Sequence, residues 1–218
     1  FFNGLDRLVG LANVWIALSG DHGIAPTPAF IKQHRLGLGN TPTRSVGEAV
    51  EGALSQTFGP EKWVEGLASN QVYLSEEAMK RRRVEPARVE AVAAEAALSA
   101  GGILAAFTRT QFLTGTLPDS PLGRKAARSF YPQRGGNVFL VREPYALPKV
   151  RDAETTHGSP WNYDAQVPLL LWGSSFRPRT YATPCEPIDL APTLAVALDL
   201  NQPSGAEGRP LVEALRPE

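Results

Sequence analysis

The sequence lacks paired cysteines, an excess of basic residues and long apolar runs, and each of these absences excludes a class of protein. Its single cysteine, Cys185, has no partner for an internal disulfide and is interpreted as a small packing residue. Lys and Arg number 22 together, as do Asp and Glu, so no basic field is present to attract nucleic acid or anionic lipid. No run reaches the roughly 18 apolar residues that a membrane span needs. We therefore expect no disulfide scaffold, no nucleic-acid partner and no membrane span.

The composition is that of a globular protein. With 218 residues, 43% of them hydrophobic and 20% charged, the chain can bury a sizeable core. No internal repeat or low-complexity linker divides it. The first residues lack the features of a signal peptide, so the sequence does not indicate the cellular location of the protein. We expect one domain over 1–218 with an inserted α/β segment at about 35–135.

Helical and extended patterns alternate along the chain, which predicts an α/β fold with a mixed, largely parallel sheet flanked by helices. Capping signals support several helices, such as the Ser45 and Glu48 capping box. The expected helices cover 1–9, 45–58, 75–83, 86–98, 123–130 and 187–198, with a short one after 208. The expected strands cover 14–19, 71–74, 103–107, 137–142 and 167–173.

An apolar run that ends at an acid and a histidine carries the first chemical signal. Residues 14–18 are apolar, and Gly-Asp-His-Gly occupies 20–23. Such runs are typical of strands covered on both faces, and binding sites form beyond the carboxyl ends of these strands. A carboxylate beside a neutral imidazole suits a divalent metal. The open alternative is that Asp21 caps the following loop and His22 bonds to the backbone.

A second His-Gly pair begins a longer motif, HGSPWNYDAQVPLLLWG, at His157. With DHG before it and IDLAPTLAVALDL and GRPL after it, the order of blocks resembles the carboxyl-terminal part of the alkaline phosphatase superfamily. The bacterial periplasmic alkaline phosphatases and the type I phosphodiesterases and nucleotide pyrophosphatases are the members it is most similar to. The blocks span nearly the whole chain. The resemblance implies an alkaline-phosphatase-like fold that is incomplete at its amino terminus.

The resemblance also implies a partial two-metal site. In this family the Asp and His of DHG bind one of two zinc ions and the His of HGSP binds the other, which matches Asp21, His22 and His157. One Asp and one His would also accept manganese. Metals about 4 Å apart, each with ligand bonds of about 2 Å, would bring the side chains of His22 and His157 within roughly 8 Å. Asp164, or a loop carbonyl near Thr155, is a candidate hydrogen-bond partner for the metal-bound His157.

The other parts of the family's site have no counterpart in the chain. These are an amino-terminal Asp, the Ser or Thr nucleophile and an Asp-x-x-x-His pair. The resemblance therefore implies that the intact parent hydrolyses small-molecule phosphate esters, in the periplasm or outside the cell. This chain alone is expected to bind metal poorly and to be inactive without the amino-terminal part. A sulfatase, phosphodiesterase or phosphomutase could share DHG, and a non-catalytic binding or structural module is the alternative from another class.

Four further features have simpler interpretations. His34 has no neighbour with ligand spacing and is interpreted as a solvated loop residue. The basic run Lys80–Arg83 is interpreted as a solvated helix end, with a phosphate-binding patch as the alternative. The glycines at 135–136 are interpreted as a turn, because no helix start follows them as a phosphate cradle requires. Asp189 lies near the start of a helix, where we expect it to be structural.

Overall fold

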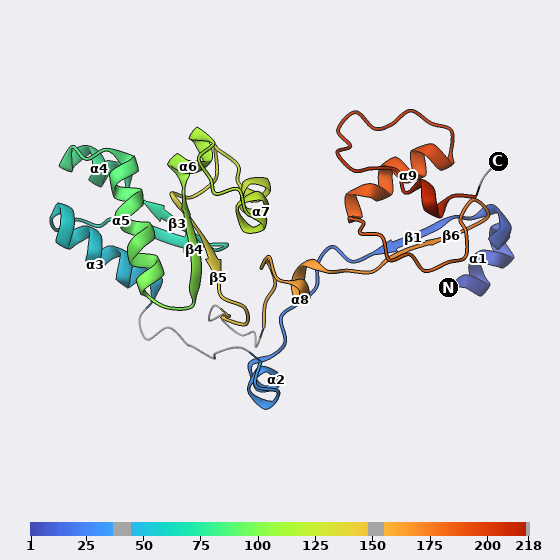
Figure 1. Ribbon diagram of the computed structural model, residues 1–218, viewed down its shortest axis with the longest axis horizontal. Coiled ribbons are helices and arrows are strands. Elements are labelled where there is room, and N and C mark those ends of the chain that lie inside the picture. The colour runs from blue at the N-terminus through green and yellow to red at the C-terminus, as the bar shows by residue number, and fades with distance from the viewer. Residues whose placement is uncertain (37–44, 148–154, 217–218) are drawn as a thin grey trace. The chain divides into compact units, whose positions relative to one another are not determined.

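The structure is a computed structural model, and it divides into two compact units (Figure 1). It describes residues 1–36, 45–147 and 155–216. The smaller unit joins Phe1–Gly23 to Gln166–Glu218, and the larger unit is Ile24–Ala165.

The expected insertion at about 35–135 falls within the larger unit, although its residues 37–44 lie outside the described part of the chain. Its status as an insertion stays a prediction. The four blocks of the family motif are divided between the units, because the residues from His157 to Ala165 belong to the larger one.

The smaller unit is built on two antiparallel strands. Gly10 ends the first helix with a φ of 74°, a conformation that glycine adopts without strain. The chain then enters β1, whose register with β6 runs from Ile16 opposite Trp172 to Ser19 opposite Leu169. The elements of this unit are α1 (Phe2–Val9), β1 (Ile16–Ser19), β6 (Leu169–Trp172), α9 (Leu190–Ala197) and 3-10 turns at Leu11–Asn13, Pro187–Asp189 and Val212–Ala214.

The β1 strand is less covered than the sequence predicted. Leu18 is 58% exposed, and Leu170, its partner on β6, is 55% exposed. Within the described part of the chain, β1 and β6 pair only with each other. The expectation of a strand buried on both faces is wrong here, because a two-stranded ribbon lacks the neighbouring strands and helices that would cover both faces.

Asp189 holds the carboxyl-terminal segment together. Its Oδ2 accepts the amide of Glu186 at 2.9 Å, and its Oδ1 accepts the amide of Arg209 at 2.8 Å. The hydroxyl of Thr193 donates to the Asp189 carbonyl at 2.6 Å and accepts the amide of Leu211 at 2.8 Å. The structural role expected for Asp189 is confirmed, since these bonds tie the start of α9 to the chain after 208.

The larger unit packs helices on a four-stranded sheet of order β2-β3-β5-β4 (Figure 1). Helices α3 and α5 contact each other and cover the sheet around the fully buried Trp63 and Leu54. The strands are β2 (Val64–Ala68), β3 (Gln71–Leu74), β4 (Ile103–Thr108) and β5 (Val138–Arg142). The helices are α2 (Pro28–Gln33), α3 (Val46–Phe58), α4 (Glu76–Arg82), α5 (Pro86–Ser99), α6 (Arg109–Thr114), α7 (Pro121–Ser129) and α8 (Asn162–Ala165).

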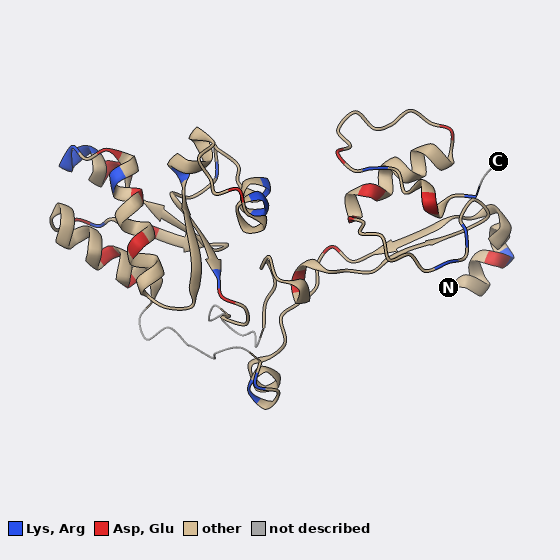
Figure 2. Ribbon diagram, in the orientation of Figure 1, with Lys and Arg blue, Asp and Glu red and all other residues tan. Residues whose placement is uncertain are grey.

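Several of these elements form where local sequence signals predicted them. The Ser45 hydroxyl accepts the amide of Glu48 at 3.2 Å and the Glu48 carboxylate accepts the amide of Ser45 at 3.3 Å, so the capping box is confirmed. Helix α4 carries acidic residues at its start and basic residues at its end (Figure 2). In the predicted basic run, Arg81 and Arg82 both bond to Glu61. That contact favours the structural interpretation of the run.

The α/β class is confirmed, but the pairing direction differs from the prediction. In both sheets of the described chain, each strand pair is antiparallel and none is parallel. One cause is local. Ser69 and Asn70 have φ of 47° and 60° and form a two-residue turn between β2 and β3, a connection that only antiparallel neighbours can make.

Candidate metal and phosphate-ester site

Asp21 and His22 lie side by side just after β1, where the sequence placed them. Their carboxylate Oδ2 and ring Nε2 are 3.5 Å apart, and both side chains are exposed. Gly20 precedes them with its Cα close to Val167, where an added Cβ would come within 3.2 Å of the valine side chain. The close packing at Gly20 therefore helps to fix the point at which the chain leaves the strand.

The ring of His22 is oriented by the backbone. Its Nδ1 is 2.6 Å from the carbonyl oxygen of Gly23, and a carbonyl can only accept a hydrogen bond. In a neutral ring this contact puts the proton on Nδ1 and leaves the lone pair on Nε2, which lies 3.5 Å from Asp21 Oδ2. The Asp21 Oδ1 also accepts the amide of His22 at 3.0 Å. Both bonds fit the alternative interpretation, in which Asp21 caps the following loop and His22 bonds to the backbone. They also favour the tautomer that a metal ligand needs.

The spacing of this pair fits two ligands of one ion. Two ligand atoms at about 2.0–2.1 Å from a tetrahedral metal lie roughly 3.4 Å from each other. The distance of 3.5 Å between Asp21 Oδ2 and His22 Nε2 agrees with that value. A carboxylate oxygen and an imidazole nitrogen are also ligand types that zinc and manganese accept. The donor set therefore suits a divalent ion.

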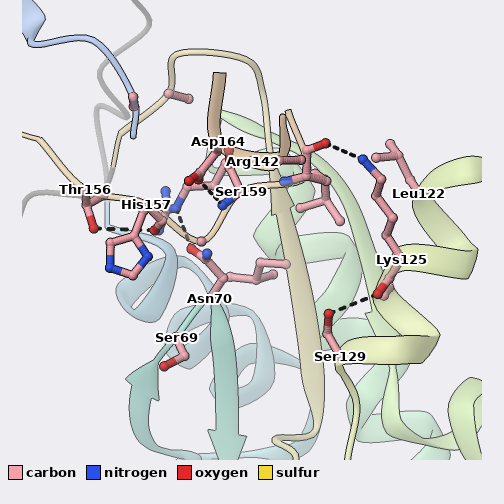
Figure 3. Close-up of a pocket in the computed structure, with 18 of the residues that line it drawn as sticks. Ser69, Asn70, Leu122, Lys125, Ser129, Arg142, Thr156, His157, Ser159 and Asp164 are labelled. Carbon is pink, nitrogen blue, oxygen red and sulfur yellow. Dashed lines mark hydrogen bonds between the residues drawn. The ribbon is translucent and has the colours of Figure 1, made fainter. Parts of the chain in front are cut away.

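His157 lies on an anchored loop of the larger unit. Thr155 donates its hydroxyl to the Ala25 carbonyl at 2.5 Å, and the Ala25 amide donates to the Thr156 carbonyl at 3.2 Å. The His157 side chain is exposed at the rim of a cavity (Figure 3). Bonds on its amino-terminal side thus hold the loop against the segment at Ala25.

Asp164 anchors the other side of the same loop. It is 3% exposed, and its Oδ2 accepts the amide of Ser159 at 2.6 Å. Its Oδ1 has no hydrogen-bond partner within the described residues, and neither has the buried Ser159 hydroxyl. The bond to Ser159 gives Asp164 a loop-fixing role. A direct contact between Asp164 and the ring of His157 stays a prediction.

A cavity of about 420 Å³ opens beside His157 within the larger unit. Helix α7, the end of strand β5, the β2–β3 turn and the His157 loop enclose it (Figure 3). Its walls combine apolar and charged side chains, which include Leu122, Lys125, Phe139, Arg142, His157 and Asp164. The charged residues Lys125 and Arg142 were missed by sequence reasoning, since no local pattern marks them.

The predicted ligands are thus distributed over both units. Asp21 and His22 belong to the smaller unit, whereas His157 and Asp164 belong to the larger one. Within the residues that the structure describes, no group of three His, Cys, Asp or Glu side chains could hold a metal ion. The approach of His157 to the Asp21–His22 pair stays a prediction. His34, interpreted as a solvated loop residue, ends helix α2 and packs its ring on Phe30 at 4.1 Å between centroids.

Comparisons with known proteins show which proteins the chain resembles. The chain is 30% identical over 217 residues to a protein named calcium-transporting ATPase from Myroides odoratus. It is 26% identical over 216 residues to the alkaline phosphatase PafA of Elizabethkingia meningoseptica and 25% identical over 220 residues to the alkaline phosphatase PhoV of Synechococcus elongatus. Each match covers 99% of the chain but only 38–39% of the relative. No protein-family profile matches the chain.

A solved structure of PafA matches with a TM-score of 0.86 and 25% identity, over 99% of the chain and 41% of PafA. Fold and sequence thus define the class as an α/β protein on a phosphatase scaffold. More specifically, the chain is similar in sequence to alkaline phosphatases and in fold to part of PafA, so the predicted resemblance is confirmed. The chain spans about two-fifths of the length of these relatives.

Proposed function

We propose that this chain is part of a longer protein that hydrolyses phosphate esters with bound divalent metal ions. The observation that carries the proposal is the match of 99% of the chain to alkaline phosphatases in both sequence and structure. The substrates are small-molecule phosphate esters, either monoesters or diesters. The amino-terminal part of the same protein is the partner that completes the site.

In this proposal Asp21 and His22 bind one ion and His157 binds the second, and both ions are zinc. Support comes from the 3.5 Å spacing of Asp21 Oδ2 and His22 Nε2 and from the ligand-competent tautomer of His22. When bound, the metals would supply positive charge to the attacking and leaving oxygens of the phosphoryl group. The Gly23 carbonyl keeps the His22 ring oriented for this purpose.

Residues on both sides of His157 hold the loop that carries it. Thr155 and Asp164 fix the loop on both sides of it through bonds of 2.5 and 2.6 Å. A ligand held in place before the metal arrives loses little conformational freedom on binding, which raises affinity. These residues therefore act by positioning, and neither is proposed to touch the substrate.

Three ligands for two ions are too few for tight binding, because zinc sites use three or four protein ligands each. The 218 residues alone are therefore proposed to bind zinc weakly and, without a nucleophile, to be inactive. A periplasmic or extracellular location is proposed from the family. Within the described residues, no helix has the length and apolar character to cross a membrane.

The test compares this chain with the longer protein that contains it. Both are supplied with zinc and assayed for p-nitrophenol release from p-nitrophenyl phosphate and bis(p-nitrophenyl) phosphate, and for phosphate release from ATP, which is included because one relative is named an ATPase. We expect release by the longer protein and none above background by the 218 residues. Failure of the longer protein with all three compounds, together with no bound metal, would instead favour a non-catalytic module on the same scaffold.

A further inference from the structure

Arg142 is a half-buried cation that faces the cavity beside His157. It ends strand β5, and its Nε donates to the Asn70 side-chain oxygen at 3.0 Å. Burial lowers the pKa of the Arg142 guanidinium, and no carboxylate of the described chain offsets that effect. The group nevertheless stays protonated, as arginine does in proteins. A partly desolvated positive charge without a counter-ion favours binding of an anion.

A second cation lies on the opposite wall of the same cavity. Lys125 of α7 donates from Nζ to the Pro160 carbonyl at 2.7 Å (Figure 3). An ammonium group has three hydrogens, so this bond leaves two of them for other acceptors. Arg128 on the same helix also lines the cavity, against the acids Glu143 and Asp164. The lining residues therefore carry three cationic and two acidic side chains, an excess of one positive charge.

Apolar side chains form most of the remaining wall. Leu122 and Ala126 of α7 line the cavity, as do Phe139 and Val141, which share one face of β5. The volume of about 420 Å³ lies within the range of small-molecule sites, roughly 300–1,000 Å³. Apolar walls with a few charged groups are the usual lining of such sites. The chemistry thus suits an organic anion with a flat or compact apolar body.

We propose that this cavity binds the organic part of the phosphate ester and selects esters in which that part carries a second negative charge, received by Arg142. This inference rests on the proposed function, because His157 links the cavity to the metal centre. An ester whose phosphoryl group is held beside His157 places its organic part at the mouth of the cavity. The apolar walls then contact the body of that group, and Arg142 with Lys125 contacts its anionic end.

The test uses two esters that differ in one charge, phenyl phosphate and 4-carboxyphenyl phosphate. With the longer protein, kcat/KM is expected to be about tenfold higher for the carboxylated ester, and Arg142→Met is expected to bring the ratio close to one. Arg142→Lys, which keeps the charge, should retain part of the preference. Arg124→Met is the matched control, because Arg124 lies on α7 beside the cavity but pairs with the exposed Asp119 outside it.

A wild-type ratio near one, or an unchanged ratio in Arg142→Met, would overturn the inference. The wild-type ratio needs no variant, so poor folding of Arg142→Met, checked by thermal melting, leaves the test decisive. Benzoate binding measured by NMR titration separates this inference from the proposed function. Benzoate should bind the wild type and Arg142→Lys more tightly than Arg142→Met even if no ester is hydrolysed, and equal affinities would refute the cavity's role.

Discussion

The backbone amide of Ser159 donates a 2.6 Å hydrogen bond to the buried carboxylate of Asp164, five residues further along. This bond closes the loop that begins at His157. Asp164→Ala would leave the amide without its acceptor, a loss of about 1–3 kcal/mol for a buried group. We expect the free energy of unfolding of the larger unit to fall by about 2 kcal/mol, measured by urea denaturation.

Asp164→Asn separates geometry from charge, because its amide oxygen can still accept from Ser159. It should lose less stability than Asp164→Ala. Asp119→Ala, at an exposed position on the loop before α7, is the control and should change stability by less than about 0.5 kcal/mol. Equal losses for Asp164→Ala and Asp119→Ala would show that the Ser159 bond does not hold the loop.

The three histidines of the chain should differ in their effect on metal binding. In the longer protein, His22→Ala and His157→Ala each remove a proposed ligand, and each should lower zinc affinity by more than tenfold. His34→Ala is the control, since His34 packs on Phe30 at the end of α2. Competition with a chromogenic chelator gives the three affinities. A loss in His34→Ala as large as in His157→Ala would contradict the assignment.

Glu90 is a buried carboxylate that supports the sheet from helix α5. It is 1% exposed, and it accepts the amide and hydroxyl of Thr110 at 2.9 and 2.7 Å and the side-chain amide of Asn137 at 3.3 Å. Glu90→Ala leaves these donors unsatisfied and opens a cavity, so we expect a destabilisation of about 3 kcal/mol. Glu95→Ala, an exposed position on the same helix, should change stability little. Chemical denaturation of both variants measures the difference.

Glu61 makes the stability of the larger unit depend on pH. Its hydrogen bond from Arg81 is the main cause that lowers its pKa below 4.5, and Arg82 contributes. A carboxylate with a lowered folded-state pKa stabilises the fold above its unfolded value and loses that contribution as pH falls through the folded value. The stability difference between wild type and Glu61→Gln should therefore be present at pH 7 and shrink between about pH 4.5 and lower values. A difference that stays constant down to pH 2.5 would exclude this linkage.

Local signals in the sequence predicted the elements whose causes are local. The Ser45–Glu48 capping box and the glycine after α1 fix their helices through neighbouring residues. Strand β2 was missed because its start is held from a distance, by the Glu51 carboxylate that accepts the Val64 amide at 2.7 Å across 13 residues. Pairing direction failed for the same reason, since apolar runs do not encode which strand lies alongside.

In the candidate site too, the sequence predicted only residues that a motif marks. Asp21 and His22 could be predicted from an apolar run that ends at ligand-type residues, whereas His157 required the order of the motif blocks. Arg142 carried no signal, because its partner Asn70 lies 72 residues away and segments far apart in the sequence form the cavity around it. Such contacts come from tertiary packing, which a pattern within one segment does not contain.

The central claim is that this chain contributes to a metal site that hydrolyses phosphate esters. The most direct measurement is p-nitrophenyl phosphate hydrolysis by the longer protein before chelation, after removal of metal with EDTA and dialysis, and after zinc is returned. In the wild type, hydrolysis should be lost when the metal is removed and should return when zinc is added. In His22→Ala and His157→Ala, hydrolysis should return only weakly. Full activity in the metal-free protein, or full recovery in both variants, would contradict it.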